Sequence, residues 1–113
     1  MGKFLDRLSS TKSETVDLLN EAERAGCMPI ASHANRTRVT VHGTLRSVTL
    51  RPVDGVSALE AELYDGSCGV TLIWLGRRKI EGITCGKQLT VEGRLGTRGQ
   101  ERVIYNPRYE LDA

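Results

Sequence analysis

The side chains in this sequence that could do metal or thiol chemistry are few and irregularly spaced. The cysteines Cys27, Cys68 and Cys85 form no Cys-x-x-Cys pair, so neither a zinc knuckle nor a redox motif is indicated. Cys27, His33 and His42 follow one another without the regular spacing of metal ligands. Three reduced thiols that serve as small apolar residues are the simpler interpretation, and they favour a cytoplasmic protein. We therefore expect no metal and no other cofactor.

No arrangement typical of a catalytic site is present either. The sequence lacks a nucleophile elbow, a Gly-x-x-x-x-Gly-Lys phosphate loop and a His-x-x-x-His pair. Gly93, Gly96 and Gly99 are spaced three apart, but no helix is expected after them, so they indicate a hairpin. Glu60 and Glu62 are better explained as a salt-bridged surface pair than as an acid and a base. The sequence predicts a protein that is not an enzyme.

The basic residues permit nucleic-acid binding without requiring it. The chain of 113 residues has a net charge of only +2, but arginine outnumbers lysine 12 to 4. The positive balance falls in residues 36–113, with twelve basic and nine acidic groups. Arginine pairs well with phosphate and stacks on bases, although it also covers ordinary surfaces.

Composition and hydropathy indicate a single domain that does not associate with a membrane. Hydrophobic residues make up 39% of the chain and charged residues 27%, which is ordinary for a globular protein. No stretch approaches the ~18 consecutive apolar residues of a membrane helix. Residues 1–10 lack the apolar centre of a secretory signal.

The first part of the chain, residues 1–35, is predicted to be a helical leader. Residues 13–25 contain no glycine or proline, and Val16, Leu19 and Ala22 form one stripe at helical spacing. Gly26 stands where a helix C-cap belongs. Because a helix of ~13 residues rarely holds alone in water, we expect the leader to pack on the rest of the protein through that stripe.

From residue 36 onward, apolar and polar residues alternate, which is typical of strands. We expect five strands, over residues 36–50, 58–64, 70–75, 89–95 and 102–105, with a turn over residues 51–55 and a crossover containing a short helical turn over residues 76–83. Gly43 predicts a bend or bulge in the first strand. The inward residues are expected to be Val39, Val41, Leu59, Leu63, Val70, Leu72, Leu89, Val91 and Leu95.

This pattern predicts an all-β protein with an N-terminal helix, in which residues 36–113 form a five-stranded Greek-key OB barrel, the oligonucleotide/oligosaccharide-binding fold. Strand spacing alone also allows an SH3-like barrel. The interruption after the third strand, together with the glycines inside the first and fourth strands, favours the OB barrel.

Five segments then carry a resemblance to a known family. They are Val-Thr-Val-His-Gly-Thr-Leu (39–45), Leu-Tyr-Asp-Gly-Ser (63–67), Val-Thr-Leu-Ile-Trp-Leu-Gly (70–76), Gly-Lys-Gln-Leu-Thr-Val-Glu-Gly-Arg (86–94) and Tyr-Asn-Pro-Arg-Tyr-Glu (105–110). In this order they resemble the wedge domain of RecG-type branched-DNA helicases and the anticodon-binding domain of class II aminoacyl-tRNA synthetases. The whole chain is similar to small stand-alone actinobacterial OB-fold proteins that bind nucleic acid. The resemblance implies a nucleic-acid-binding module, although a fold does not by itself fix its use.

OB domains usually bind their ligand across the second and third strands, between the loop joining strands 1 and 2 and the loop joining strands 4 and 5. On this scheme the candidate nucleic-acid-binding residues are Arg46, Arg51, Arg77, Arg78, Lys79, Arg94, Arg98 and Arg102. Such groups can follow a phosphate backbone. Because aromatic rings for stacking are scarce, we expect weak binding to single-stranded or branched DNA, or to RNA.

Two features favour a protein partner instead. By alternation, Glu60 and Glu62 point outward, where they would repel phosphate. On the next strand, Thr71, Ile73 and Leu75 would form an outer stripe too apolar to face water. We expect either the N-terminal helix or a second chain, in a homodimer or a complex with another protein, to cover this stripe. The alternative function is therefore a protein-interaction adaptor.

Overall fold

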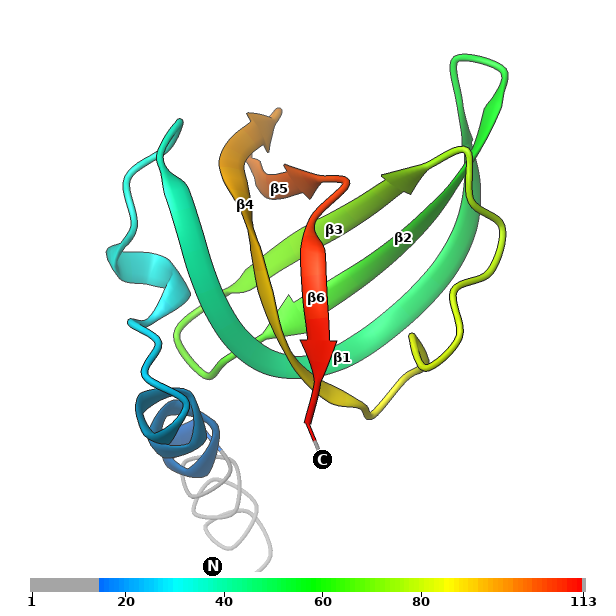
Figure 1. Ribbon diagram of the computed structural model, residues 1–113. Coiled ribbons are helices and arrows are strands. Elements are labelled where there is room, and N and C mark those ends of the chain that lie inside the picture. The colour runs from blue at the N-terminus through cyan, green and yellow to red at the C-terminus, as the bar shows by residue number, and fades with distance from the viewer. Residues whose placement is uncertain (1–14, 113) are drawn as a thin grey trace, which may run out of the picture.

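The computed structural model describes residues 15–112. A helix occupies residues 15–24 and is followed by a short 3-10 helix and six strands (Figure 1). These are η1 (Ile30–Ser32), β1 (Arg38–Val53), β2 (Val56–Tyr64), β3 (Gly69–Leu75), β4 (Gln88–Arg98), β5 (Glu101–Tyr105) and β6 (Arg108–Leu111). The predicted class, all-β with an N-terminal helix, is confirmed. The predicted number of strands is one too small.

The strands form one mixed sheet in the order β1-β2-β3-β5-β4-β6, and β1 makes an additional pairing with β4. Only the β3–β5 pairing is parallel. β1 pairs with β4 through residues 38–44 and with β2 through residues 44–53, so it bends where it changes partner. A Cβ atom on Gly43 would lie 2.5 Å from the Tyr64 carbonyl oxygen. The bend predicted at Gly43 is confirmed, because only glycine allows β2 to approach this closely.

The hairpin between β1 and β2 has a shorter turn than the sequence predicted. β1 continues through Arg51 and Pro52 to Val53, and the turn consists only of Asp54 and Gly55, with φ of +51° and +78°. An Asp-Gly pair with both φ values positive is typical of a type I′ turn, whose twist matches that of the strands beside it. Pro52 is tolerated because this part of β1 pairs only with β2, which leaves its other edge without ladder hydrogen bonds.

The connection from β3 to β4 contains no helical turn within residues 76–87, so that prediction is wrong. One turn closes through the hydrogen bond from the Ile83 N–H to the Ile80 carbonyl, 3.1 Å long. Gly82 has a φ of +84°, a conformation that ends right-handed winding. Ile80 and Ile83 are both buried and join the main core.

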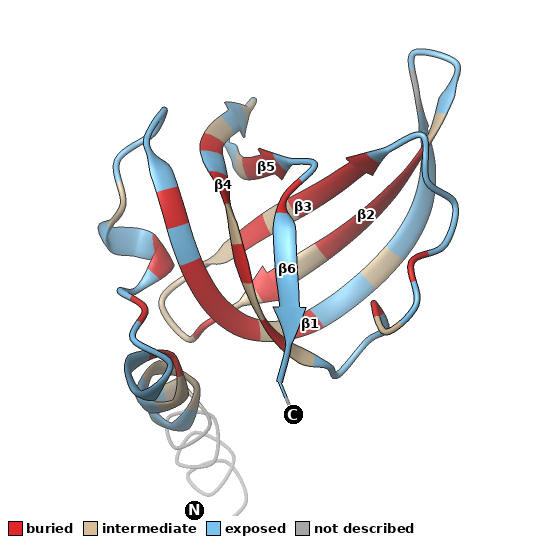
Figure 2. Ribbon diagram, viewed as in Figure 1, coloured by how far each residue is buried: buried red, intermediate tan, exposed pale blue. Residues whose placement is uncertain are grey.

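The sixth strand, β6, was not predicted, since the last expected strand ended at residue 105, just before Asn106 and Pro107. β5 and β6 pair with successive parts of β4, residues 95–98 and 89–92. Over residues 89–92, one edge of β4 is paired with β1. β6 therefore pairs with the opposite edge, which is also the edge that β5 uses. Proline interrupts the strand, but the chain resumes along an edge that still offers hydrogen bonds. All four β6 residues are exposed (Figure 2).

The core lies inside the curled sheet. All nine residues predicted to point inward are buried, and Trp74 joins them. The Trp74 Nε1–H donates a hydrogen bond of 3.1 Å to the Pro107 carbonyl, and its ring meets that of Tyr109 edge-on at 5.9 Å. A buried indole needs such an acceptor. This contact ties β3 to the start of β6.

The N-terminal helix ends as predicted and packs through two of the three residues of the predicted stripe. The Cys27 N–H bonds to the Ala22 carbonyl and the Gly26 N–H to the Glu23 carbonyl, the Schellman pattern in which glycine takes a positive φ. Ala22 is buried, and Leu19 lies with Thr15 against Gly66, in the turn between β2 and β3. Val16 is 53% exposed and is not part of the contact.

Asp65, in the same turn, connects the N-terminal segment to the sheet. The residue is fully buried, and its Oδ2 accepts the Ile30 N–H at 2.7 Å. Its Oδ1 accepts the N–H and the hydroxyl of Ser67, at 2.9 and 2.6 Å, and the Cys68 N–H at 3.3 Å. Ile30 itself is 1% exposed and belongs to the main core. One carboxylate thus orders both the β2–β3 turn and the entry of the chain into the core.

Replacing Asp65 should therefore destabilise the whole fold. We expect Asp65→Ala to lower the free energy of unfolding by about 3 kcal/mol or more, because several donors lose their only acceptor. Asp65→Asn should lower the free energy of unfolding by less. Its amide oxygen can still accept the hydrogen bonds of the turn, but its amide NH2 group then faces the Ile30 N–H, so that hydrogen bond is lost. Urea denaturation measures both, with Asp17→Ala on the exposed helix surface as the control. A loss below about 1 kcal/mol for Asp65→Ala would contradict this role.

Candidate nucleic-acid interface

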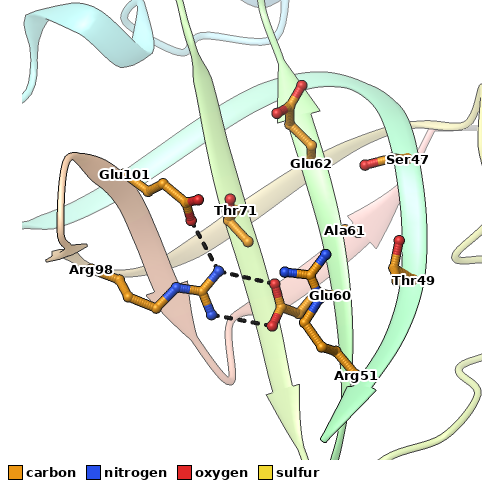
Figure 3. Close-up of a pocket in the computed structure, with 9 residues that line it drawn as sticks. All are labelled: Ser47, Thr49, Arg51, Glu60, Ala61, Glu62, Thr71, Arg98 and Glu101. Atoms are coloured by element: carbon orange, nitrogen blue, oxygen red, sulfur yellow. Dashed lines mark hydrogen bonds and ion pairs between the residues drawn. The ribbon is translucent and has the colours of Figure 1, made fainter. Parts of the chain in front are cut away.

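A polar groove lies on the outer face of β1, β2 and β3, beneath the hairpin that joins β4 to β5 (Figure 3). Its hollow measures about 150 Å³ and is lined by Ser47, Thr49, Arg51, Glu60, Ala61, Glu62, Thr71, Arg98 and Glu101. A second hollow of about 240 Å³ shares Glu62, Thr71 and Glu101 and extends the groove toward Arg102. This is the face of the second and third strands, on which the sequence analysis placed the candidate binding site.

Strand register explains why these side chains share one face. Thr49 pairs with Glu60, and Ser47 with Glu62, across β1 and β2. Directly opposed residues of an antiparallel pair point to the same side. The alternation along β2 therefore sends both glutamates outward, as the sequence predicted, while Leu59 points into the core.

Arg98 is the central charged group of the groove. Its Nη1–H and Nη2–H donate to the two carboxylate oxygens of Glu60, each at 3.1 Å. Nη2 also donates to Glu101 at 2.9 Å. Because β3 and β5 separate β4 from β2 in the sheet, the Arg98 side chain extends over the outer face to reach Glu60 (Figure 3). The ion pair holds the β4–β5 hairpin over the groove.

The same ion pair sets the protonation of Glu60. The hydrogen bond from Arg98 lowers the pKa of Glu60 and outweighs the opposing effect of burial, and the positive charges of Arg98 and Arg51 lower it further. The pKa of Arg98 is raised in turn by its hydrogen bonds to Glu60 and Glu101. Glu60 is therefore ionised and neutralised in place. The repulsion of phosphate expected from this residue is largely cancelled.

The apolar outer stripe expected on the third strand is not exposed, which corrects the sequence analysis. Ile73 and Ala58 are both 0% exposed and form a second buried cluster with Val103 of β5. The parallel pairing of β5 with β3 places Val103 beside Thr71, so neighbouring strands bury Ile73 within the chain. Only Leu75 of the stripe is exposed. The reason for expecting a helix or a second chain to cover this face is thereby removed.

Arg46 lies at the edge of the groove. Its guanidinium carbon is 3.4 Å from the centre of the Tyr64 ring, and its Nη1 is 3.4 Å from the Glu62 carboxylate. Contact between a guanidinium and an aromatic face is a favourable cation–π interaction. Arg46 therefore pairs with Glu62, as Arg98 pairs with Glu60 and Glu101.

The structure brings together only part of the predicted site. Arg46, Arg51 and Arg98 line or border the groove, and Arg102 lies in its extension, with Nη1 3.5 Å from the Cys68 sulfur. Arg94 is opposite Arg38 in the β1–β4 pairing and is therefore away from β2 and β3.

The basic run Arg77, Arg78 and Lys79 is exposed and begins two residues after the end of β3. These three side chains take part in none of the ion pairs formed among residues 15–112. The structure places them beyond the Leu75 end of β3, where Gly76 bonds to Ser57 of β2. They are available to a bound ligand but do not line the groove.

Among the residues of this face that the sequence analysis did not name are Glu101, which pairs with Arg98, and Tyr105. Tyr105 is 47% exposed and pairs with Ile73, so it lies on the same outer face as the groove. The position of Tyr105 two residues after Val103 could have indicated this, because alternate residues of a strand share a face. The role of Arg98 as a structural cation could not be seen, since Glu60 is 38 residues away in the sequence.

Within residues 15–112, no cluster of three or more His, Cys, Asp or Glu side chains could hold a metal ion. The cysteines are all unpaired. His42 is buried with Nε2 2.8 Å from the Asp112 carboxylate, which fixes the end of β6. No helix among these residues is long and apolar enough to cross a membrane.

Comparison with known proteins identifies a similar fold. No family model and no curated protein matches this chain. Among solved structures, the chain is similar to RecG bound to a three-way DNA junction, with a TM-score of 0.65 and 21% sequence identity. The match covers 76% of this chain but only 12% of that protein. The two therefore share a fold, that of a module within a much longer DNA-junction-binding protein.

The Arg98–Glu60 ion pair predicts how stability depends on pH. Because the pKa of Glu60 is lower in the folded protein than in the unfolded chain, its stabilising effect is complete above the unfolded value of about 4.3. The effect is lost as the pH falls from there through the lower folded value. Glu60→Gln should thus cost about 1–3 kcal/mol at neutral pH, and its deficit should shrink in acid.

Urea denaturation of wild type and variant between about pH 3 and pH 7 measures this difference. Arg98→Lys is the matched control, because it keeps the charge but loses the two-point contact, and should give an intermediate pH dependence. A deficit of Glu60→Gln that stays constant over the whole range would show that the ion pair does not set the pKa of Glu60.

Proposed function

We propose that this protein is a small nucleic-acid-binding module that holds single-stranded or branched DNA, or RNA, in the groove of β1, β2 and β3. The observation that carries the proposal is the groove itself, which is bordered by Arg46, Arg51 and Arg98 and overhung by the β4–β5 hairpin. Its fold is shared with a protein that binds a DNA junction.

We further propose that the sheet is an OB barrel with one additional strand, and that residues 36–113 are its binding domain. The pairings β1-β2-β3-β5-β4, together with β1–β4, support this assignment, because they describe the circuit of a five-stranded barrel. β6 extends the edge that β5 occupies. The chain would then resemble the small actinobacterial OB-fold proteins in which a helical leader precedes the barrel.

Binding rather than catalysis is the proposed role. The carboxylates of the groove are engaged in ion pairs, and Arg98 lowers the pKa of Glu60. A carboxyl group stabilised as the anion is a poor general acid. The three cysteines, none of which forms a disulfide, support a reducing compartment, and we propose that the protein acts in the cytoplasm.

Arginines that are not already engaged in ion pairs should supply the affinity. Arg51 and the run of Arg77, Arg78 and Lys79 form no ion pair among residues 15–112. Arg98 already donates from both terminal nitrogens to carboxylates. We therefore assign phosphate contacts to the first group and a positioning role to Arg98.

The test is a salt-titrated binding assay with single-stranded, duplex and forked oligonucleotides. Each phosphate contact adds ~0.7 to the logarithmic salt slope on a single strand, so two or three contacts predict a slope near −2. Arg77→Ala combined with Arg78→Ala should weaken binding to all sequences alike and flatten the slope by up to ~1.4. Arg51→Ala should flatten it by up to ~0.7.

A matched control removes two arginines elsewhere on the surface. Arg24 is exposed on the helix and Arg38 lies in the β1–β4 pairing, so Arg24→Ala with Arg38→Ala should leave the slope close to that of wild type. If the wild-type protein binds none of the three substrates even at about 50 mM salt, where phosphate contacts are strongest, the proposed function is wrong.

A protein-interaction adaptor is the second candidate. The observation that favours it is the set of three carboxylates, Glu60, Glu62 and Glu101, that line the groove. Acidic side chains are unusual on a surface that attracts phosphate, although here each accepts from an arginine. The absence of oligonucleotide binding in the assay above is the result that this candidate predicts.

A further inference from the structure

The bulge in β1 places Arg46 where no regular strand would. Leu45 pairs with Leu63 and Ser47 with Glu62, so Arg46 is an extra residue without a partner on β2. Bulges commonly redirect a side chain. The backbone here is held from the other side by Cys85, whose Sγ donates to the Arg46 carbonyl at 2.9 Å. The position of the Arg46 side chain is thus a defined feature of the fold.

The guanidinium of Arg46 lies over an aromatic ring. Its carbon is 3.4 Å from the centre of the Tyr64 ring, and its Nη1 is 3.4 Å from a Glu62 carboxylate oxygen. The Tyr64 hydroxyl donates to the Gly66 carbonyl at 3.3 Å, which orients the ring. The Arg46 side chain nevertheless remains 52% exposed. A flat cationic surface, backed by an aromatic ring, therefore faces solvent beside the groove.

Such a surface suits an unpaired nucleobase. A guanidinium is planar, delocalised and weakly hydrated, and it stacks on π faces. Splayed bases of single strands stack on arginine planes as they do on aromatic rings. The faces of bases inside a duplex are already covered by their neighbours, so a duplex has none to offer. This matters in a chain with few aromatic residues, because Arg46 and Tyr64 together provide a stacking surface that neither the count of rings nor the net charge reveals.

We propose that the Arg46–Tyr64 pair is a stacking subsite for one unpaired base, which makes single-stranded nucleic acid the preferred ligand of the groove. This inference rests on the proposed function and deepens it. Glu62 links the subsite to the groove, since it contacts Arg46 and lines both hollows. Arg51 lies five residues further along β1 and is available to the phosphates of the same strand.

Fluorescence anisotropy with three labelled probes tests the subsite. The probes are an oligothymidylate of about 12 nucleotides, within the site size of one OB domain, an abasic strand of the same length, and a blunt duplex. Arg46→Lys keeps the charge but removes the planar surface. It should weaken binding to the oligothymidylate about fivefold to tenfold while leaving the abasic strand and the salt slope unchanged. Arg24→Lys, on the exposed helix surface, is the matched control.

Tyr64→Leu provides a second variant, expected to weaken the oligothymidylate by a similar factor because the guanidinium loses its support. The thermal melting of Tyr64→Leu is measured alongside, since Tyr64 is half-buried and its replacement can disturb the fold. If Tyr64→Leu misfolds, the result for Arg46→Lys alone tests the subsite. The inference is overturned if Arg46→Lys binds the oligothymidylate as wild type does, if it loses the abasic strand equally, or if wild type binds the duplex as tightly as the single strand. In those cases the proposed function stands. Failure of wild type to bind any of these probes or the forked oligonucleotide of the salt-titrated assay overturns both.

Discussion

The rest of the structure depends on the change of partner in β1. The first part of this 16-residue strand pairs with β4 and the second part pairs with β2. Pairing with both strands requires a sharp bend. Gly43 provides the space, because the Tyr64 carbonyl occupies the position of a side chain. Three residues later the bulge at Arg46 shifts the register of the pairing with β2 by one residue. The curl of the sheet, the enclosed core and the outward projection of Arg46 all follow from these few residues.

The arginines of the groove have two different roles. Arg98 forms ion pairs within the protein, with Glu60 and Glu101, and thereby fixes the position of the β4–β5 hairpin. A partly buried ion pair of this kind is strongly coupled, so the loss of one partner leaves the other desolvated and unpaired. Arg51 and the basic run after β3 are exposed and form no ion pair among residues 15–112. A count of arginines in the sequence does not distinguish these roles.

The buried side chains of the strands were predictable because alternation is a local property. Leu59, Leu63 and Leu72 point inward as expected, and Gly26 ends the helix as expected. Ile73 lies on the outer face as expected, but its burial was missed because it depends on β5, a strand that comes some 30 residues later in the chain and pairs in parallel. The same limitation hid the function of Asp65, whose partner Ile30 is 35 residues away. The end of the sheet was missed because Pro107 looks like a terminator, whereas β4 still offered a free edge to the residues after it.

The sequence by itself determined the class of the protein, the inward face of each central strand and the bend at Gly43, since short-range periodicity and glycine stereochemistry act over a few residues. It also determined that arginine, rather than aromatic residues, would dominate the candidate surface. Only the tertiary structure decided which arginines reach the groove, which one is neutralised by Glu60, and which one lies flat on Tyr64. Those outcomes depend on register and on strands that meet across long stretches of chain, and the energy of an ion pair or a stacked ring exists only once both partners are in place.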